Sequence, residues 1–148
     1  MKACVQRVKY CRLSIEDNLV SEIGKGLLIL LGVAEGDTDA DASLLASKCS
    51  GMRIFEDENE KMNLSVDDIG GEIMSVSNFT LCSDTRKGKR PSFTTAAKPD
   101  IALPLYEKFT RELVTTKPVK TGVFGADMKI ELLNDGPVTL ILDTRDYK

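Results

Sequence analysis

The strongest constraint on the fold is one uninterrupted apolar run, Leu27-Leu28-Ile29-Leu30-Leu31, bounded by Gly26 before it and Gly32 after it. A short apolar run between glycines is typical of a strand that is buried on both faces. Such a strand needs a pairing partner on each edge and packing on each side. The run is far too short to cross a bilayer, which takes about 20 apolar residues. We therefore expect no membrane partner.

Other segments supply the partners of this strand. Period-two alternation with β-branched residues predicts strands on either side of Glu16-Asp17-Asn18, which has turn composition. Near the C-terminus, two apolar segments flank Asn134-Asp135-Gly136-Pro137, which predicts a hairpin. The expected strands cover residues 3–15, 19–23, 27–33, 72–82, 128–133 and 138–142, with a short strand near 53–55.

Two helices are expected. Thr38 is a plausible N-cap, with Asp39 and Asp41 at the positive end of the helix dipole. Pro99 opens the second helix, and Pro118 ends it. The apolar stripes of the two helices comprise Ala42, Leu45, Ala46, Cys49, Ala102, Leu105, Tyr106, Phe109 and Leu113.

The strands come in runs rather than in regular strand-helix-strand alternation. We therefore predict one α+β domain over residues 1–148, a compact barrel-like mixed or antiparallel sheet with about two outer helices. Residues 56–71 and 83–95 are polar and are expected to be surface loops.

The chain has no histidine, which excludes whole classes of enzyme. Ser-His-Asp and Cys-His nucleophiles and zinc sites with imidazole ligands are impossible. The four cysteines are scattered without a C-x-x-C pair, so we expect no metal centre. No apolar run of signal-peptide length stands at the N-terminus, so we expect a cytoplasmic protein with reduced thiols.

A basic run stands out against a formal net charge of −3. It consists of Arg86, Lys87, Lys89 and Arg90, and Ser92, Thr94 and Thr95 follow in the same loop. Cations with neighbouring hydroxyls suit phosphate contacts, although a solvated basic loop has the same composition.

Polar residues interrupt the expected strand 72–82 at Ser77-Asn78-Phe79-Thr80. On a strand, Ser77 and Phe79 would face one way and Asn78 and Thr80 the other, so a polar outer face is the plain alternative. Nothing near Thr80 in the sequence supplies a base that would make it a nucleophile.

Two glycine-containing segments each have a functional interpretation and a commoner structural one. The peptide bond of Gly136-Pro137 could be cis, although trans is the commoner state. Gly122 to Met128 could bring the backbone close to a flat ligand, or could be a strand entry with a core Phe124.

Taken together, these segments resemble the D-aminoacyl-tRNA deacylase family. The resemblance runs nearly end to end, through MKACVQRV, RIFEDENEKMNLSV, GGEIMSVSNFTL, DTRKGKRPSF and FGADMKIELLNDGPVTLILDT. It implies a homodimer that hydrolyses the ester joining a D-amino acid to the 3′ end of tRNA, and that also clears mischarged glycine. It implies no cofactor.

The resemblance also implies roles for individual residues. Ser77, Phe79 and Thr80 would form the catalytic group, with the terminal ribose hydroxyl of tRNA assisting water. Asn78 stands where the family usually has Gln, which is one methylene longer. A cis Gly136-Pro137 would enter the partner's site and exclude L-amino acids.

The remaining roles that the resemblance implies concern binding. Arg7 would hold the Gly-Pro loop, and Phe124 and Met128 would line the terminal adenosine. The basic run 86–90 would hold the acceptor-stem phosphates. The alternative function is a non-catalytic nucleic-acid-binding module that uses the same basic run.

Overall fold

The computed structural model describes all 148 residues, and its organising element is the long strand β1 (Lys2–Ile15). One edge of β1 pairs antiparallel with β3 (Gly26–Gly32) and then with β2 (Asn18–Ile23). The other edge pairs with β8 (Lys129–Asp143). The turn between β1 and β2 has positive φ at Glu16 and Asp17, as a tight hairpin turn requires.

The sheet continues from β3 through two parallel pairings. β3 pairs with β6 (Glu72–Ser77), and β6 pairs with β7 (Lys120–Thr121). Ser21 on β2 donates a hydrogen bond to the carbonyl of Thr121 on β7, so the sheet curls back toward its first strands. The expected mixed, barrel-like sheet is confirmed.

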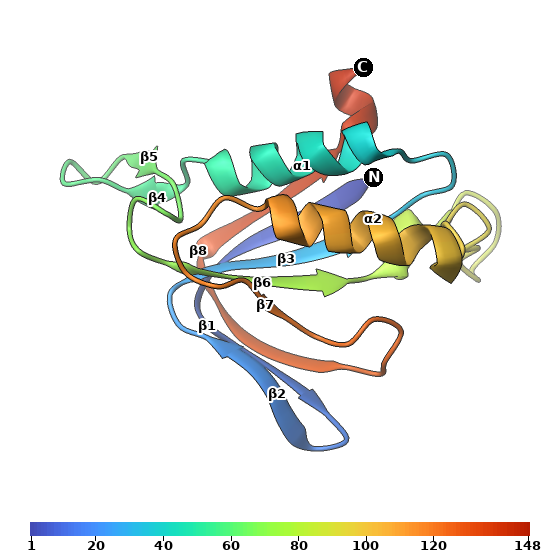
Figure 1. Cartoon of the computed structure of the whole chain (residues 1–148), viewed down its shortest axis with the longest axis horizontal. Coiled ribbons are helices and arrows are strands. Elements are labelled where there is room, and N and C mark those ends of the chain that lie inside the picture. The colour runs from blue at the N-terminus through green and yellow to red at the C-terminus, as the bar shows by residue number, and fades with distance from the viewer.

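Both helices cover the same face of the sheet (Figure 1). Helix α1 (Asp39–Gly51) begins after Thr38, whose backbone N–H and hydroxyl both donate to Asp41. Helix α2 begins at Pro99 as expected, but it ends at Glu112, well before Pro118. Leu45 of α1 and Leu105 of α2 belong to the same hydrophobic core as apolar side chains of β3, and this core is the larger of the two.

The apolar run of β3 is buried on both faces, as its sequence predicts. Leu27, Ile29 and Leu31 face the helices, whereas Leu28 packs on the opposite side of the sheet with Met74 and other side chains of the smaller core. The short strand expected near 53–55 forms as β4 (Phe55–Glu56), and its partner β5 (Met62–Leu64) lies in the expected loop 56–71.

The expected strand 72–82 is wrong in its second half. β6 ends at Ser77, and Phe79–Cys82 form a short 3₁₀ helix, η1. The chain turns because the Asn78 N–H bonds to the Leu31 carbonyl at 2.7 Å and the Asn78 side chain caps the next turn. The alternation of side chains predicted for residues 77–80 therefore does not occur.

The expected C-terminal hairpin is also wrong, because residues 129–143 form one strand. Both halves of β8 pair with β1, with Leu142 opposite Ala3 and Ile130 opposite Leu13. The Asp135-Gly136-Pro137 segment bulges where the register shifts between Gln6 and Val8. Pro137 is tolerated there because β8 has no partner on its second edge, so no sheet hydrogen bond is lost.

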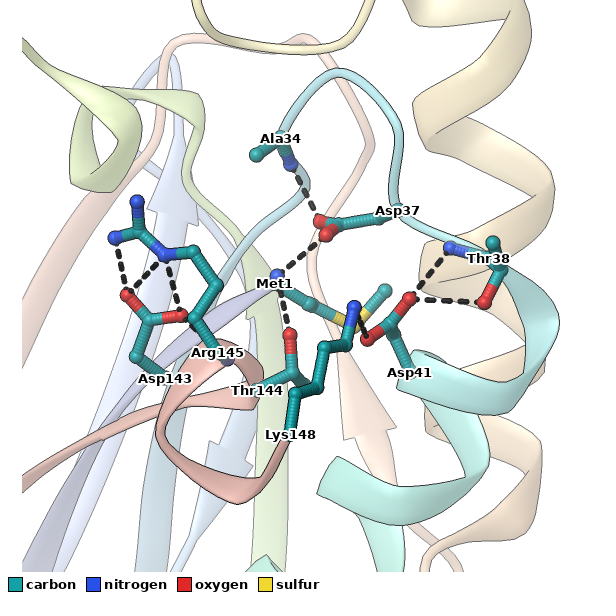
Figure 2. Close-up of polar contacts among 9 residues, drawn as sticks. All are labelled: Met1, Ala34, Asp37, Thr38, Asp41, Asp143, Thr144, Arg145 and Lys148. Carbon is teal, nitrogen blue, oxygen red and sulfur yellow. Dashed lines mark hydrogen bonds and ion pairs between the residues drawn. The ribbon is translucent and has the colours of Figure 1, made fainter.

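Near the chain termini, charged groups form a network of their own (Figure 2). The Met1 ammonium contacts Asp37 at 2.6 Å and the Thr144 hydroxyl of the second 3₁₀ helix, η2 (Thr144–Tyr147), at 2.8 Å. Lys148 pairs with the buried Asp41 at 3.0 Å. Burial raises the pKa of Asp41, but its contacts with Lys148 and with hydroxyl and backbone groups outweigh burial and lower that pKa.

No helix of this structure has both the length and the apolar character that crossing a bilayer requires.

Candidate functional site

A cavity of about 790 Å³ opens where β6 runs into η1. Its walls come from the end of β6, from η1, from the start of α2 and from the segment that leads into β8, and 14 of its 20 lining residues are hydrophobic. Six of the residues singled out in the sequence line it: Ser77, Asn78, Phe79, Thr80, Phe124 and Met128. The structure thus joins two motifs that lie far apart in the chain.

The turn into η1 leaves one main-chain donor open. The Thr80 N–H donates to the side-chain oxygen of Asn78 at 3.3 Å, and the Thr80 hydroxyl donates to the same oxygen. The Phe79 N–H, at the start of η1, has no partner within the chain. A neutral amide oxygen is a very weak base, so this contact does not activate Thr80 as a nucleophile.

Aromatic and thioether groups form the apolar wall of the cavity. Phe124 packs against Tyr106 with ring centroids 6.0 Å apart, and the Tyr106 hydroxyl donates to the Ser75 carbonyl at 2.8 Å. Burial raises the pKa of Tyr106, which keeps its hydroxyl neutral. A side chain at Gly122 would collide with the Met128 sulfur, so this glycine makes room for Met128.

The mouth of the cavity carries a residue that the sequence analysis missed. Phe93 lies edge-to-face with Phe79 at a centroid distance of 5.2 Å, and both rings are partly open to solvent. An aromatic residue just after a basic run could have drawn attention to Phe93, because nucleic-acid sites combine cations with aromatic faces. Phe93 connects the basic loop to the cavity.

Gly136, Pro137 and Arg7 do not line this cavity. The Gly136-Pro137 bond is cis, and Gly136 has a φ of +133°. The buried Arg7 donates to the carbonyls of Asp135 at 3.1 Å and Ile54 at 2.7 Å, so its guanidinium does contact the segment that carries the Gly-Pro motif.

The bulge has a second internal tether. The side-chain nitrogen of Asn134 donates to the Arg7 carbonyl at 3.1 Å and to the Val138 carbonyl at 3.0 Å. Together with the Arg7 guanidinium, these contacts fix both ends of the Asp135-Gly136-Pro137 segment.

The basic loop lies outside the cavity and is closed at its base. Asp84 and Ser92 exchange two backbone hydrogen bonds, of 2.8 and 2.9 Å. Arg86 is bound to Asp84, with a shortest contact of 2.7 Å, and this lowers the pKa of Asp84 to about 2. Lys87, Lys89 and Arg90 are exposed and form no ion pair. Three of the four expected phosphate-binding cations are therefore free.

Charged and metal-binding groups play little part in the cavity. Asp127 is the only carboxylate in its lining, and no three Cys, Asp or Glu side chains cluster anywhere in a way that could hold a metal ion. The four thiols are free, but none lines the cavity. Burial raises the pKa of Cys49 to about 12 and that of Cys11 to about 11, so these two are poor nucleophiles.

Comparison with known proteins places this site in a family. The family model for D-Tyr-tRNA(Tyr) deacylase matches residues 4–143. A D-aminoacyl-tRNA deacylase of Parabacteroides distasonis is 55% identical over 148 residues, and one of Flavobacterium psychrophilum is 53% identical. Each alignment covers 99% of both chains.

Two solved structures have the same fold. One, described as a c-Myc DNA unwinding element binding protein, has a TM-score of 0.91 at 37% identity and covers 97% of this chain and 98% of its own. The other, described as a probable eukaryotic D-amino acid tRNA deacylase, has a TM-score of 0.77 at 17% identity, with 95% and 97% covered. With the family model matching almost the whole length and relatives above half identity, the chain belongs to the D-Tyr-tRNA(Tyr) deacylase family.

Proposed function

We propose that this chain hydrolyses the ester bond of D-aminoacyl-tRNA and of mischarged glycyl-tRNA. The observation that carries the proposal is the unpartnered Phe79 N–H at a cavity lined by residues 77–80 and by Phe124 and Met128. An aminoacyl ester is already activated, so a fixed hydrogen-bond donor can supply most of the catalysis that hydrolysis needs. The family match along 4–143 supports the same activity.

In the proposed reaction, water attacks the ester carbon and the carbonyl oxygen takes up the negative charge. The Phe79 N–H donates to that oxygen as its charge develops. The bond from the ester carbon to the ribose oxygen then breaks, the ribose oxygen takes a proton, and the free D-amino acid and tRNA leave. The neighbouring ribose hydroxyl of tRNA orients the water, so no basic side chain is required.

We place the selection against L-amino acids between two protomers. The cavity of one chain lacks its own Gly136-Pro137, while β8, which carries this motif, has an unpaired edge. Exposed apolar side chains on β8, with Leu133 51% and Ile141 67% exposed, support a contact with a second copy. In the homodimer, the carbonyls of Gly136 and Pro137 would enter the partner's cavity and exclude an L side chain.

The rest of the tRNA would lie along the basic loop. Lys87, Lys89 and Arg90 suit the acceptor-stem phosphates, and Phe124 and Met128 offer an apolar surface to the terminal adenosine. Charged tRNA is found where translation occurs, so we propose a cytoplasmic location, which four free thiols support.

The test is a deacylation assay with three charged tRNAs. We expect release of D-Tyr from D-Tyr-tRNA and of glycine from glycyl-tRNA, with L-Tyr-tRNA left intact. Equal hydrolysis of the D and L forms would contradict exclusion by the Gly-Pro carbonyls. No hydrolysis of any of the three would overturn the proposed activity itself.

A second candidate function is nucleic-acid binding without catalysis. It is favoured by the three free cations of the loop and by the 37% identity to a structure described as a DNA unwinding element binding protein. Binding of uncharged tRNA and of duplex DNA, measured against salt concentration, separates the two functions. Tight duplex binding without deacylation would favour this candidate.

A further inference from the structure

Phe93, at the mouth of the cavity, has an aromatic ring that is not part of either hydrophobic core. This residue is 38% exposed and Phe79 beside it is 57% exposed, whereas Phe55 and Phe109 are buried. The rings of Phe79 and Phe93 meet edge to face at 77°, so one ring offers only its edge and keeps both of its faces free of the other. Exposed aromatic surface at the mouth of a cavity indicates a place that a ligand covers.

The main chain on both sides of Phe93 is tied to the body of the protein. Before it, Ser92 exchanges backbone hydrogen bonds with Asp84. After it, the Thr95 hydroxyl donates to the Cys82 carbonyl at 2.6 Å. The ring of Phe93 is therefore positioned before any ligand binds, and little conformational entropy is lost when a flat group stacks on it.

The groups around Phe93 are those that a nucleotide requires. Ser92 and Thr94 flank it with exposed hydroxyls 3.2 Å apart; one hydroxyl hydrogen joins the pair, and the other has no partner within the chain. The free cations Lys87, Lys89 and Arg90 precede it in the same loop. An aromatic face, hydroxyl donors and unpaired cations in one loop are the combination with which proteins bind single-stranded nucleic acid.

Resting on the proposed function, we propose that Phe93 stacks on the base of the nucleotide just before the terminal adenosine of tRNA. The terminal adenosine would lie on Phe124 and Met128, and the acceptor-stem phosphates would lie along the basic loop. Phe93 lines the cavity and belongs to that loop, so an RNA strand that joins the two sites passes it. The bases of a single-stranded RNA end are free to stack on aromatic side chains in this way.

The test compares two charged tRNAs that differ in a single base. One is D-Tyr-tRNA, and the other is the same charged tRNA with an abasic residue in place of the cytidine before the terminal adenosine. In wild-type protein we expect the cytosine base to raise kcat/KM for deacylation about 10-fold, a typical contribution of one base stacked on an aromatic side chain. In Phe93→Ala this gain should disappear, whatever the variant does to the hydrolysis of either tRNA alone.

Two further variants separate stacking from apolar packing. Phe93→Trp keeps an aromatic face and should keep the gain, whereas Phe93→Leu keeps apolar bulk and should lose most of it. The matched control is Tyr147→Ala, which removes a ring at a position that is 44% exposed and lies outside the cavity, and it should keep the wild-type gain. An undiminished gain in Phe93→Ala or in Phe93→Leu would overturn the inference.

The same assay distinguishes failure of this inference from failure of the proposed function. If wild-type protein hydrolyses the two charged tRNAs equally fast, the stacking contact is wrong and the deacylase activity stands. If wild-type protein hydrolyses neither of them, the proposed function itself is wrong.

Discussion

The cavity and the network at the chain termini are built from different kinds of polar group, neutral in the cavity and charged in the network. In the network, the Met1 ammonium, Asp37, Asp41 and Lys148 form ion pairs that tie both ends of the chain to the start of α1 (Figure 2). In the cavity, the polar groups nearest η1 are neutral: main-chain N–H groups, hydroxyls and one side-chain amide. The comparison teaches that charged groups stabilise this fold, whereas the proposed chemistry relies on neutral groups fixed by the backbone.

This difference explains why the proposed reaction does not require a histidine. An imidazole is the commonest base where a nucleophile must lose a proton, but the proposed reaction relies on donors whose positions are fixed by folding. Changes at the bulge or in the cavity should therefore alter catalysis, whereas changes in the network should alter stability alone.

The largest effect is expected at Gly136, in the bulge of β8. A side-chain carbon there would lie 2.7 Å from the Val138 side chain and 2.9 Å from its nitrogen, and the φ of +133° is unfavourable for other residues. We expect Gly136→Ala to lower kcat/KM by about 100-fold or more. Gly70→Ala, at a φ of +63° with no neighbour within 4 Å, is the matched control for backbone strain and should keep its activity.

Mixed dimers test whether the motif acts in the partner's cavity. A Gly136→Ala protomer keeps its cavity, and a protomer with a disabled cavity, such as Phe79→Pro, keeps its Gly-Pro motif. Mixing the two inactive variants should restore part of the activity, since each mixed dimer has one complete site. Mixtures as inactive as their components would contradict action in trans.

The second largest effect is expected in the network, on stability. The contacts with Lys148 and Thr38 lower the pKa of Asp41, so its ionised form stabilises the fold at neutral pH. Asp41→Asn should lower the free energy of unfolding by about 1–3 kcal/mol at pH 7, measured in urea, without changing kcat.

The same variant has a pH signature. A carboxyl whose pKa is lower in the folded state stabilises fully above its unfolded pKa of about 4 and loses this effect as the pH falls toward the folded value. The gap between wild type and Asp41→Asn should therefore narrow below about pH 4. Asp39→Asn, an exposed change in the same helix turn, is the control. An unchanged urea midpoint of Asp41→Asn at pH 7 would contradict the claim that the network stabilises the fold.

A moderate effect is expected in the basic loop. Replacing Lys87, Lys89 and Arg90 by glutamine should raise KM for tRNA by about 10-fold at low salt and flatten its salt dependence, with kcat unchanged. Arg86→Gln should matter less, because Arg86 already pairs with Asp84. If Arg86→Gln alone raises KM for tRNA as much as the triple variant does, the distinction between the paired Arg86 and the three free cations is wrong.

The smallest effect is expected at Thr80. Its hydroxyl bonds to an amide oxygen that cannot take its proton, so Thr80→Ala should keep kcat within about fivefold. Single-turnover deacylation measures this directly. A loss on the order of 10⁴-fold would instead indicate a covalent nucleophile.

Local patterns predicted the helix starts and the doubly buried strand well. Thr38, Pro99 and the run 27–31 act through neighbours in sequence or through burial alone, and the structure has each as expected. The two wrong strand predictions depend on distant partners. Residues 129–143 form one strand because β1 is long enough to pair with both halves, which no local pattern reveals.

Prediction of the candidate site from the sequence is limited in the same way. The polar run 77–80 was visible in the sequence, but its turn depends on a hydrogen bond from Asn78 to Leu31 on a separate strand. Phe93 reaches Phe79 only because the loop closes between Asp84 and Ser92. Contacts across the sheet, rather than residue types, decide which donors remain open.

The most direct test of the neutral site compares two changes at Phe79. Phe79→Ala removes the ring and keeps the N–H, whereas Phe79→Pro removes both. Proline suits the first position of η1, since the N–H there has no partner to lose and Asn78 before it is extended, with φ −147° and ψ 90°.

The measurement is single-turnover deacylation of D-Tyr-tRNA by these two folded variants. The account predicts that Phe79→Pro is about 100-fold slower than Phe79→Ala, with similar binding of tRNA. Equal rates for the two variants would contradict catalysis by the main-chain N–H of Phe79.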